Sequence, residues 1–418
     1  MNECKKVKLG ELYEVHNGLS KGRQFFGSGY PFLSFSTVFN NWFLPSTLDS
    51  LVQSSEKERT ACSIKRGDVF ITRTSETMDE LGMSSVALRD YPNATYNGFT
   101  KRLRPITDNV IPEYIGYYLR SPKFRGKFMA FSTMTTRASL ANADLLGMEV
   151  EIPSKEEQHR IATILSRYDS LIENYQKQIK LLEEAAQRLY KEWFVDLHFP
   201  GHENTKIVNG VPEGWEKKKL ADVCDTIGGG TPSTKVVSYY EGGTISWVTP
   251  TDITKNNSLC LLSTEKKITH EGLNHSSAKM LPKEAILMTS RASVGFFGIC
   301  DFEVCTNQGF ISCVPFEKDF QMYLLCNLIN RVEEIRIKAG GSTYLEISKS
   351  VFRNFDIICP AQSVIKDFQG KAHSLLERTR IIAKQIRLIT EARDRLLPKL
   401  MSGEIDIKRP EGAMSWQP

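Results

Sequence analysis

The chain has 418 residues, more than a single domain usually holds, so its length predicts two or three domains. Its hydrophobic content of 41% is enough for folded cores, and its formal net charge of +5 permits a nucleic-acid partner without arguing for one. There is no membrane-length apolar run, no apolar signal core at the start and no C-x-x-C pair among the nine cysteines, so we expect a cytoplasmic protein without a membrane partner.

Residues 1–153 have the pattern of a mixed α/β domain. Residues 30–38 (YPFLSFSTV) alternate apolar and small polar residues, which is typical of a half-buried strand that leads into a loop. The segments 65–75 (KRGDVFITRTS) and 95–99 (TYNGF) each join an apolar stretch to a polar loop. We expect this part of the chain to fold by itself as globular domain 1.

A long helix is predicted over residues 154–197, directly after a proline. Apolar residues recur there at steps of four and three for more than four heptads, which is the 3.5-residue period of a coiled-coil seam. The predicted seam contains Ile161, Leu165, Tyr168, Ile172, Ile179, Leu182 and Leu189. The helix lies in the middle of the chain, so it has to connect two parts of the fold.

Residues 198–215 are rich in Gly, Pro and Asn and form the predicted linker to globular domain 2, residues 216–359. A second long helix is predicted over residues 360–405, followed by a tail of residues 406–418 whose end, KRPEGAMSWQP, is expected to be disordered. The seam of this helix contains Phe368, Leu375, Ile382, Ile386, Ile389 and Leu396.

The two halves of the chain resemble each other. Five segments of the first half have counterparts in the second half, in the same order and at an offset of about 205–216 residues. The segment 30–38 corresponds to GTISWVTPTDI, 65–75 to LPKEAILMTSRAS, and TYNGF to TNQGF at residues 306–310. No single pair is persuasive, but five in one order indicate a tandem duplication.

Two seams of matching length in one chain most simply pack on each other. About 38 helical residues measure roughly 57 Å, longer than a small domain is wide. We therefore predict an α+β fold, a tandem repeat of a mixed domain and a long helix, with the helices forming an antiparallel coiled-coil spacer and a pseudo-two-fold axis. The alternative is that each helix buries its stripe against its own domain.

A search for an active site finds no catalytic or metal-binding constellation. Residues 22–28 have the glycine spacing of a P-loop, but Ser28 stands where the phosphate-binding Lys belongs. His198 and His202 are four apart, but Pro200 lies between them and breaks the helix that would align them on a metal. The E-x-K tripeptides at 216–218 and 265–267 are expected by chance. We expect no metal and no cofactor bound by this chain.

Small polar residues beside Arg, Lys, amides and aromatics recur in loops after strands, at equivalent places in both halves. Such loops expose backbone N–H groups and hydroxyls to phosphates, and Arg, Asn and Gln can bond base edges, so we predict a DNA interface in each domain. Taken singly, such a loop is more often a plain surface turn. The candidates are Lys21, Arg23, Gln24, Ser36, Thr37, Arg73, Thr74, Ser75, Thr135, Thr136 and Arg137 in domain 1, and Thr231, Ser233, Thr234, Lys235, Trp247, Thr249, Thr251, Ser290, Arg291, Asn307, Gln308, Ser342, Thr343 and Tyr344 in domain 2.

The chain resembles the specificity subunit of type I restriction–modification systems over nearly its whole length. The motifs that carry the resemblance are GGGTPSTK, LPKEAILMTSRASVGFFGI, CTNQGF and GGSTYLEIS in domain 2, with IPSKEEQHRIATIL and PKLMSGEIDI in the spacers. Domain 1 matches more loosely, with residues 135–140 standing where GGSTYL stands in domain 2.

The resemblance implies a non-catalytic reader of double-stranded DNA. Each target-recognition domain would read one half of a bipartite asymmetric site, and the spacer would set the gap between the halves and dock two adenine-methyltransferase subunits, which use S-adenosylmethionine. Restriction and translocase subunits, which use ATP and Mg, would join for cleavage. Two alternatives are a stand-alone bivalent DNA-binding or scaffolding protein and an enzyme with a fused specificity half, for which the repeat leaves no room.

Overall fold

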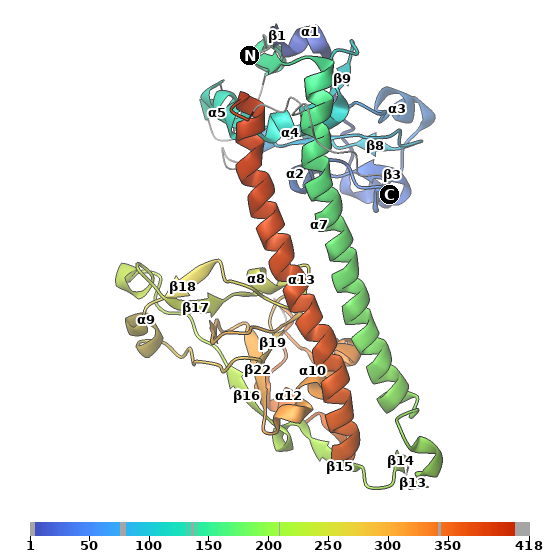
Figure 1. Cartoon of the computed structure of the whole chain (residues 1–418), viewed down its shortest axis with the longest axis vertical. Coiled ribbons are helices and arrows are strands. Elements are labelled where there is room, and N and C mark those ends of the chain that lie inside the picture. Colours follow the sequence, from blue (N-terminus) through green and yellow to red (C-terminus); the bar gives the residue numbers. More distant parts are fainter. Residues whose placement is uncertain are drawn as a thin grey trace, which may run out of the picture. The chain divides into compact units, whose positions relative to one another are not determined.

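The structure is a computed structural model that describes residues 5–75, 81–131, 133–134, 138–139, 141–208, 210–341 and 344–405 (Figure 1). The chain divides into two compact units. Unit 1 contains Met1–Leu171 and Ile389–Pro418, and unit 2 contains Ile172–Leu388. Each unit therefore combines one globular domain with a portion of both long helices. Among the described residues, no helix is long and apolar enough to cross a membrane.

Domain 1 is built on a four-stranded antiparallel sheet, β2-β9-β5-β7, and a three-stranded sheet, β4-β3-β8, in which β3 and β8 run parallel. The strand that opens the domain, β1, pairs with β12, the strand that leads into the first long helix. The strands are β1 Lys5–Lys8, β2 Tyr13–Asn17, β3 Phe26–Leu33, β4 Ser50–Val52, β5 Val69–Thr72, β6 Thr74–Ser75, β7 Ser84–Val86, β8 Thr95–Tyr96, β9 Thr100–Pro105, β10 Thr133–Met134, β11 Ala138–Ser139 and β12 Glu149–Ile152. The helices are α1 Leu9–Leu12, η1 Arg23–Phe25, α2 Phe35–Asn40, α3 Glu56–Ala61, α4 Pro112–Arg120, α5 Pro122–Phe131 and α6 Asn142–Gly147.

Domain 2 repeats this plan, with a four-stranded sheet β16-β22-β19-β20, a three-stranded sheet β18-β17-β21 and the pair β15-β23 before the second long helix. The strands of this half are β13 Ile207–Val208, β14 Val211–Pro212, β15 Glu216–Lys219, β16 Cys224–Gly228, β17 Ile245–Val248, β18 Lys266–Ile268, β19 Ile286–Thr289, β20 Phe297–Gly298, β21 Cys305–Thr306, β22 Phe310–Pro315 and β23 Asp356–Cys359. The helices are η4 His202–Asn204, η5 Leu220–Asp222, η6 Val237–Tyr239, α8 Pro250–Thr254, α9 His270–Asn274, η7 Lys318–Phe320, α10 Gln321–Asn330, α11 Val332–Lys338 and α12 Lys349–Arg353.

The matching sheet orders confirm the duplication, and the strand registers correct one detail of it. In the four-stranded sheets, Thr100 stands opposite Thr72 and Phe310 stands opposite Thr289. Thr100 therefore corresponds to Phe310, an offset of 210 residues, whereas the match of TYNGF with TNQGF places Phe99 there. That alignment is wrong by one position, because a shared Gly-Phe dipeptide carries no information on which residue faces its partner strand.

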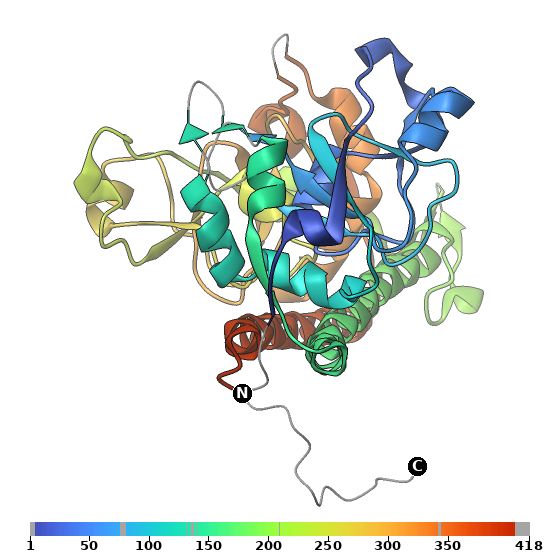
Figure 2. The same ribbon diagram turned by 90° about the horizontal axis from the view of Figure 1, so that it is seen from above.

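The long helices are α7, Lys155–Tyr190, which continues as a π-helical turn over Lys191–Val195, and α13, Gln362–Ser402. In unit 2, Ile179 packs against Ile382 and Ala383, while Tyr190, eleven residues further along α7, meets Phe368 at a ring distance of 6.3 Å. The two helices therefore run in opposite directions in this unit. In unit 1 they lie on the same side of domain 1, as the view along them in Figure 2 shows.

The predicted seam residues contact the domains as well as each other. Ile161 and Leu165 are buried in the core of domain 1, which they share with Leu400 of α13. Phe368 is buried in the core of domain 2, but Leu375 is only half-buried while its neighbour Leu376 is 3% exposed. The remaining half-buried seam positions are Tyr168, Ile172, Leu182, Leu189, Ile386, Ile389 and Leu396. Both interpretations of the stripes thus apply in part, because each helix is covered partly by a domain and partly by its partner.

Two polar interruptions of the second seam are accommodated by specific bonds. The Arg393 guanidinium lies 2.5 Å from the Asp169 carboxylate and 4.8 Å from the centre of the Trp42 ring. The Tyr117 hydroxyl donates to the same carboxylate over 2.5 Å. Thr379, which is 1% exposed, donates its hydroxyl to the carbonyl of Leu375 one turn earlier. Buried polar groups at these positions are therefore paired, as their burial requires. The tail lies outside the described residues.

Candidate nucleic-acid interface

The candidate loops of domain 2 begin at one edge of its two sheets. The end of β16 and the end of β19 both face the start of β22, where Gly228 pairs with Ile311 and Thr289 with Phe310. The parallel strands β17 and β21 end side by side. Backbone bonds then join the loops to one another, from Asn307 N to Val248 O (3.1 Å), Gly230 N to Thr306 O (2.9 Å) and Ser290 N to Gly309 O (2.8 Å). The topology thus collects four loops into one surface.

Glycine is required where these loops approach most closely. A Cβ on Gly229 would lie 2.1 Å from the carbonyl oxygen of Asn307, and one on Gly230 would lie 2.3 Å from the Ser277 hydroxyl. Neither position has room for a side chain, since real Cβ atoms do not come this close to other heavy atoms. The GGGTPSTK segment can therefore cross the edge only because it begins with glycines.

The side chains at this edge of domain 2 are polar and largely accessible. The Thr231 hydroxyl donates to the Gln308 side-chain oxygen, which leaves the amide N–H groups of this exposed glutamine facing solvent. The Arg291 side chain is 48% exposed, with its Nε 3.6 Å from the Glu346 carboxylate, and Tyr344 is 60% exposed. Guanidinium and amide groups in this setting can form paired hydrogen bonds with base edges.

Domain 1 has the same edge, built on the equivalent strands. Backbone bonds join Asn97 N to Leu33 O (3.0 Å), Leu19 N to Tyr96 O (2.8 Å) and Arg73 N to the carbonyl of Phe99 (3.0 Å). The side-chain oxygen of Asn97 accepts from the N–H two residues later, as the Asn307 side-chain oxygen does in domain 2. The two domains therefore present different side chains on one backbone frame.

Known proteins share both the sequence and the fold. Residues 1–184 and 212–386 match the family described as the type I restriction modification DNA specificity domain. The chain is 28% identical over 424 residues to the type I restriction enzyme MjaIX specificity subunit of Methanocaldococcus jannaschii, covering 97% of this chain and 94% of that one. It is 25% identical over 472 residues to the HindI specificity subunit of Haemophilus influenzae, covering 97% and 100%. The chain belongs to the type I restriction–modification specificity family.

A solved structure shares the fold of this chain. The crystal structure of the type I restriction–modification S subunit from M. genitalium superposes with a TM-score of 0.53 over 96% of each chain, at 14% identity. At that level of identity the likeness concerns the fold alone. The two globular domains are accordingly called target-recognition domains from here on.

Three residues of the second target-recognition domain that were predicted to contact DNA are buried or form hydrogen bonds within the domain. Trp247 is 5% exposed and donates its indole N–H to the carbonyl of Gly230 over 3.0 Å. Ser290 is 3% exposed. Thr249 caps α8, with its backbone N–H and its hydroxyl both 2.7 Å from the Asp252 carboxylate. The burial of Trp247 and Ser290 argues against direct DNA contacts by their side chains, whereas a DNA contact by the half-buried Thr249 stays a prediction.

The other candidates of this domain are exposed or fall outside the described residues. Thr251, Ser233, Thr234 and Lys235 are exposed, the last three in the loop before η6. Ser342 and Thr343 lie outside the described residues. The exposed residues that share the edge formed by the strand ends are thus Thr231, Arg291, Gln308 and Tyr344, together with the half-buried Asn307.

In the first target-recognition domain, several candidates serve local structure. Ser36 and Thr37 bond through their hydroxyls to Ser34, the N-cap of α2. The Lys21 ammonium is 2.7 Å from the Gln53 carbonyl and 2.8 Å from the Glu58 carboxylate. The hydrogen bond from Lys21 and, to a smaller extent, the one from the Ser55 backbone N–H together lower the pKa of Glu58 to about 2.

The remaining candidates of this domain lie in two places, near the edge formed by the strand ends and in the short helix η1 before β3. Arg23 and Gln24 are exposed in the short helix η1, and Arg73 is half-buried directly after β5. Thr74 and Ser75 form β6, which pairs with β11. Thr135, Thr136 and Arg137 lie outside the described residues.

Two residues at this edge were missed by the sequence analysis. Lys101 follows the loop and is 4% exposed, with its ammonium bonded to the side-chain oxygen of Asn142. Burial lowers the pKa of Lys101, and the positive charge of Arg73 lowers it further. Phe99 is 56% exposed. Its position was concealed by the one-residue error in the alignment of the two halves, which equated it with the buried Phe310.

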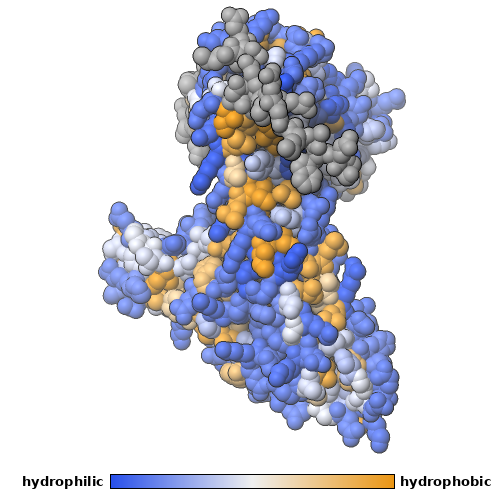
Figure 3. All heavy atoms as spheres, in the orientation of Figure 1, coloured by the Kyte–Doolittle hydropathy of each residue, from blue (hydrophilic) through white to orange (hydrophobic). Residues whose placement is uncertain are grey.

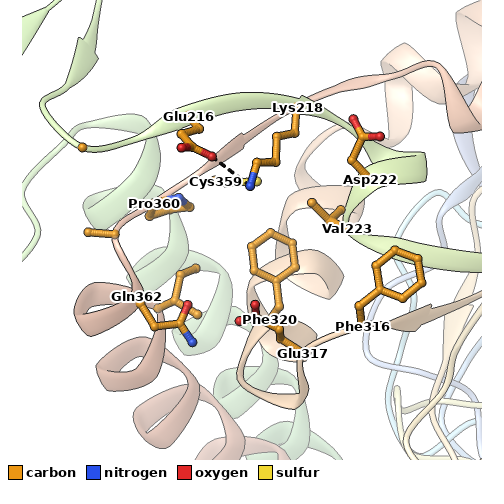
Figure 4. Close-up of a pocket in the computed structure, with 13 residues that line it drawn as sticks. Glu216, Lys218, Asp222, Val223, Phe316, Glu317, Phe320, Cys359, Pro360 and Gln362 are labelled. Carbon is orange, nitrogen blue, oxygen red and sulfur yellow. Dashed lines mark ion pairs between the residues drawn. The ribbon is translucent and has the colours of Figure 1, made fainter.

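A cavity of about 210 Å³ lies in unit 2 beside the start of α13 (Figure 4). The Glu216 carboxylate and the Lys218 ammonium pair across 2.8 Å on its wall. Cys359 also lines the cavity, and burial raises the pKa of its thiol to about 11, so this thiol stays protonated at neutral pH. The residues that line the cavity form no nucleophile with an adjacent base. Within the described part of the chain, no group of three or more His, Cys, Asp or Glu residues could hold a metal ion.

Proposed function

We propose that the chain is the DNA-reading subunit of a type I restriction–modification complex, in which each target-recognition domain reads one half of a bipartite asymmetric site in double-stranded DNA. The observation that carries the proposal is the shared edge described above. The same strand ends and loop bonds present Arg73 and Asn97 in one domain and Arg291, Asn307 and Gln308 in the other. The two domains share a backbone arrangement but carry different side chains on it. This favours recognition of a different base sequence by each domain, because direct readout depends on the donors and acceptors that each side chain offers.

We further propose that the paired helices set the gap between the half-sites. Support comes from the length of α7 and from the packing of its two ends. The 36 residues of α7 measure about 54 Å at 1.5 Å per residue. Near its start Ile161 joins the core of the first domain, and near its end Tyr190 joins the core of the second. A continuous helix with one end buried in each domain is the element that such a spacer role requires.

The helices would also dock two adenine-methyltransferase subunits. Within unit 2 they expose three large apolar side chains, Leu181 (61% exposed), Ile381 (51%) and Leu388 (59%). Figure 3 shows apolar side chains gathered over these helices. Exposed apolar residues at this density on long helices favour a protein partner over solvent. S-adenosylmethionine would be bound by the methyltransferase, and ATP with Mg by the restriction and translocase subunits, while this chain would have no catalysis of its own.

The proposal is tested by mapping methylated adenines in host DNA with and without the gene for this chain. We expect one split motif to lose its methylation when the gene is deleted and to regain it when the gene is restored. If no motif changes while the methyltransferase partner is demonstrably active, the subunit role is refuted. A chain that still binds one sequence without any partner would then be a stand-alone bivalent DNA-binding protein.

A further inference from the structure

The first target-recognition domain carries an exposed aromatic side chain at the centre of its edge. Phe99 is 56% exposed and lies between the ends of β8 and β9. Its backbone is held on both sides, because its N–H donates to the Asn97 side chain over 2.6 Å and its carbonyl accepts from Arg73 N over 3.0 Å. A large apolar ring that is presented to solvent from a fixed backbone has no role in the core.

The second domain has a glycine at the same place. The residue that corresponds to Phe99 is Gly309, which likewise donates its N–H to the preceding asparagine and bonds the strand-end residue Ser290. A Cβ on Gly309 would lie 3.1 Å from the Pro250 ring, a tight contact that the ring would have to relieve by moving a few tenths of an ångström. At this position of the common backbone frame, the first domain therefore presents an aromatic ring and the second domain presents none.

Two cationic residues lie next to Phe99 along the backbone. Arg73, directly after β5, donates its backbone N–H to the Phe99 carbonyl, and Lys101 follows two residues after Phe99, close enough to Arg73 for their charges to interact. Cationic groups beside an exposed aromatic ring match the chemistry of a nucleic acid, in which phosphates flank the flat faces of the bases. An apolar protein surface would gain nothing from the same charges.

We propose that Phe99 is an aromatic wedge that stacks on a base in the half-site read by the first domain and opens one base step there. The proposal rests on the DNA-reading function proposed above and adds a difference between the half-sites. Apolar side chains that enter a base step unstack it and kink the duplex. The half-site read by the second domain is bound without such a wedge at this position, because Gly309 has no ring to offer.

The wedge is tested with the complete complex of this chain and its methyltransferase partner, on duplexes of the mapped site that carry 2-aminopurine at each position in turn. This base fluoresces more strongly when it is unstacked. Apart from the target adenines, which the methyltransferases flip out of the duplex, we expect binding of the unchanged complex to raise the fluorescence at one further step of one half-site, and Phe99→Ala or Phe99→Gly to abolish that further rise. Affinity should fall roughly 5- to 150-fold, the range measured for loss of one base–aromatic stack. Phe99→Trp should retain the signal.

Ile106→Ala is the matched control, since Ile106 is 57% exposed and follows the opposite end of the same strand, β9. This variant should leave both the fluorescence and the affinity unchanged. If Phe99→Ala binds with unchanged affinity and the same fluorescence pattern, the wedge is refuted while the DNA-reading function stands. If the unchanged complex binds no split site at all, the proposed function fails first, and the two failures are thereby distinguished.

Discussion

The stability of unit 2 depends on an aromatic cluster that joins α13 to the end of α7. Phe368 is fully buried, and its ring centre lies 4.9 Å from that of Phe194, 5.9 Å from that of Trp193 and 6.3 Å from that of Tyr190. Phe194 meets it edge-on, with an interplanar angle of 80°. We predict that Phe368→Ala destabilises this unit more than any exposed substitution on the same helix.

The magnitude follows from the burial and the ring contacts. Truncating a buried Phe to Ala costs about 3–5 kcal/mol of the free energy of unfolding, part of which is the cavity left behind. Aromatic pairs contribute about 0.5–1.5 kcal/mol each beyond their buried area, so three such contacts favour the upper half of that range. For a unit of this size, each kcal/mol lowers Tm by about 2–4 °C, so a loss of about 4–5 kcal/mol lowers Tm by about 8–20 °C.

Differential scanning calorimetry of the complete chain measures this effect on the transition of unit 2. The control is Leu388→Ala, whose side chain is 59% exposed on the same helix and which should change the free energy of unfolding by less than about 0.5 kcal/mol. Equal Tm values for the two variants would refute the view that this cluster joins the helices to the domain. A smaller loss for Phe368→Leu than for Phe368→Ala would separate lost volume from lost ring contacts.

Three further predictions concern recognition, spacing and charge. Arg291→Ala should relax specificity in one half-site by about 1–3 kcal/mol, and exclusive methylation of the original motif at full rate would contradict this. Removing residues 172–178 and 384–390 deletes one heptad from each long helix. Because seven helical residues span about 10.5 Å, this deletion should shorten the gap in the methylated motif by about three base pairs. An unchanged gap would refute the spacer role. The pKa of Glu58, about 2 beside Lys21, should rise toward 4.5 in Lys21→Met. The stabilisation by this pair is complete above the pKa of the unfolded chain and is lost as pH falls through 2, and an NMR titration with an unmoved midpoint would exclude the pairing.

The duplication and the α+β class could be predicted because they depend on patterns that survive in any single sequence. Alternating strands, glycine turns and long apolar stripes recur in order in both halves, and the two sets of sheets follow that order. The matched length of the two stripes predicted that the helices pack on each other, and the contacts of Ile179 and Tyr190 show that they are antiparallel in unit 2. These features are encoded by periodicity, which does not require knowledge of the neighbours of any one residue.

The candidate DNA surface was predictable at the level of loops and not of side chains. The exposed positions of Arg291 and Gln308 agree with their polarity, but the sequence gives no sign that Trp247 turns inward to bond a glycine carbonyl. The sequence also does not show that part of the apolar stripe of each long helix is covered by a domain. A heptad pattern indicates which face of a helix is apolar and not what packs against that face. The exposure of Phe99 depends on strand register, which a dipeptide match cannot fix.

The pairing of β1 with β12 and of β15 with β23 has a consequence for how new specificities arise. In each target-recognition domain the first strand pairs antiparallel with the strand that leads into the following long helix, so the domain begins and ends at two adjacent strands. A foreign domain inserted between the same two strands would meet the helix at the same place. Under the proposed function, recombination at these boundaries would exchange one reading surface as a unit and leave the half-site read by the other domain unaltered.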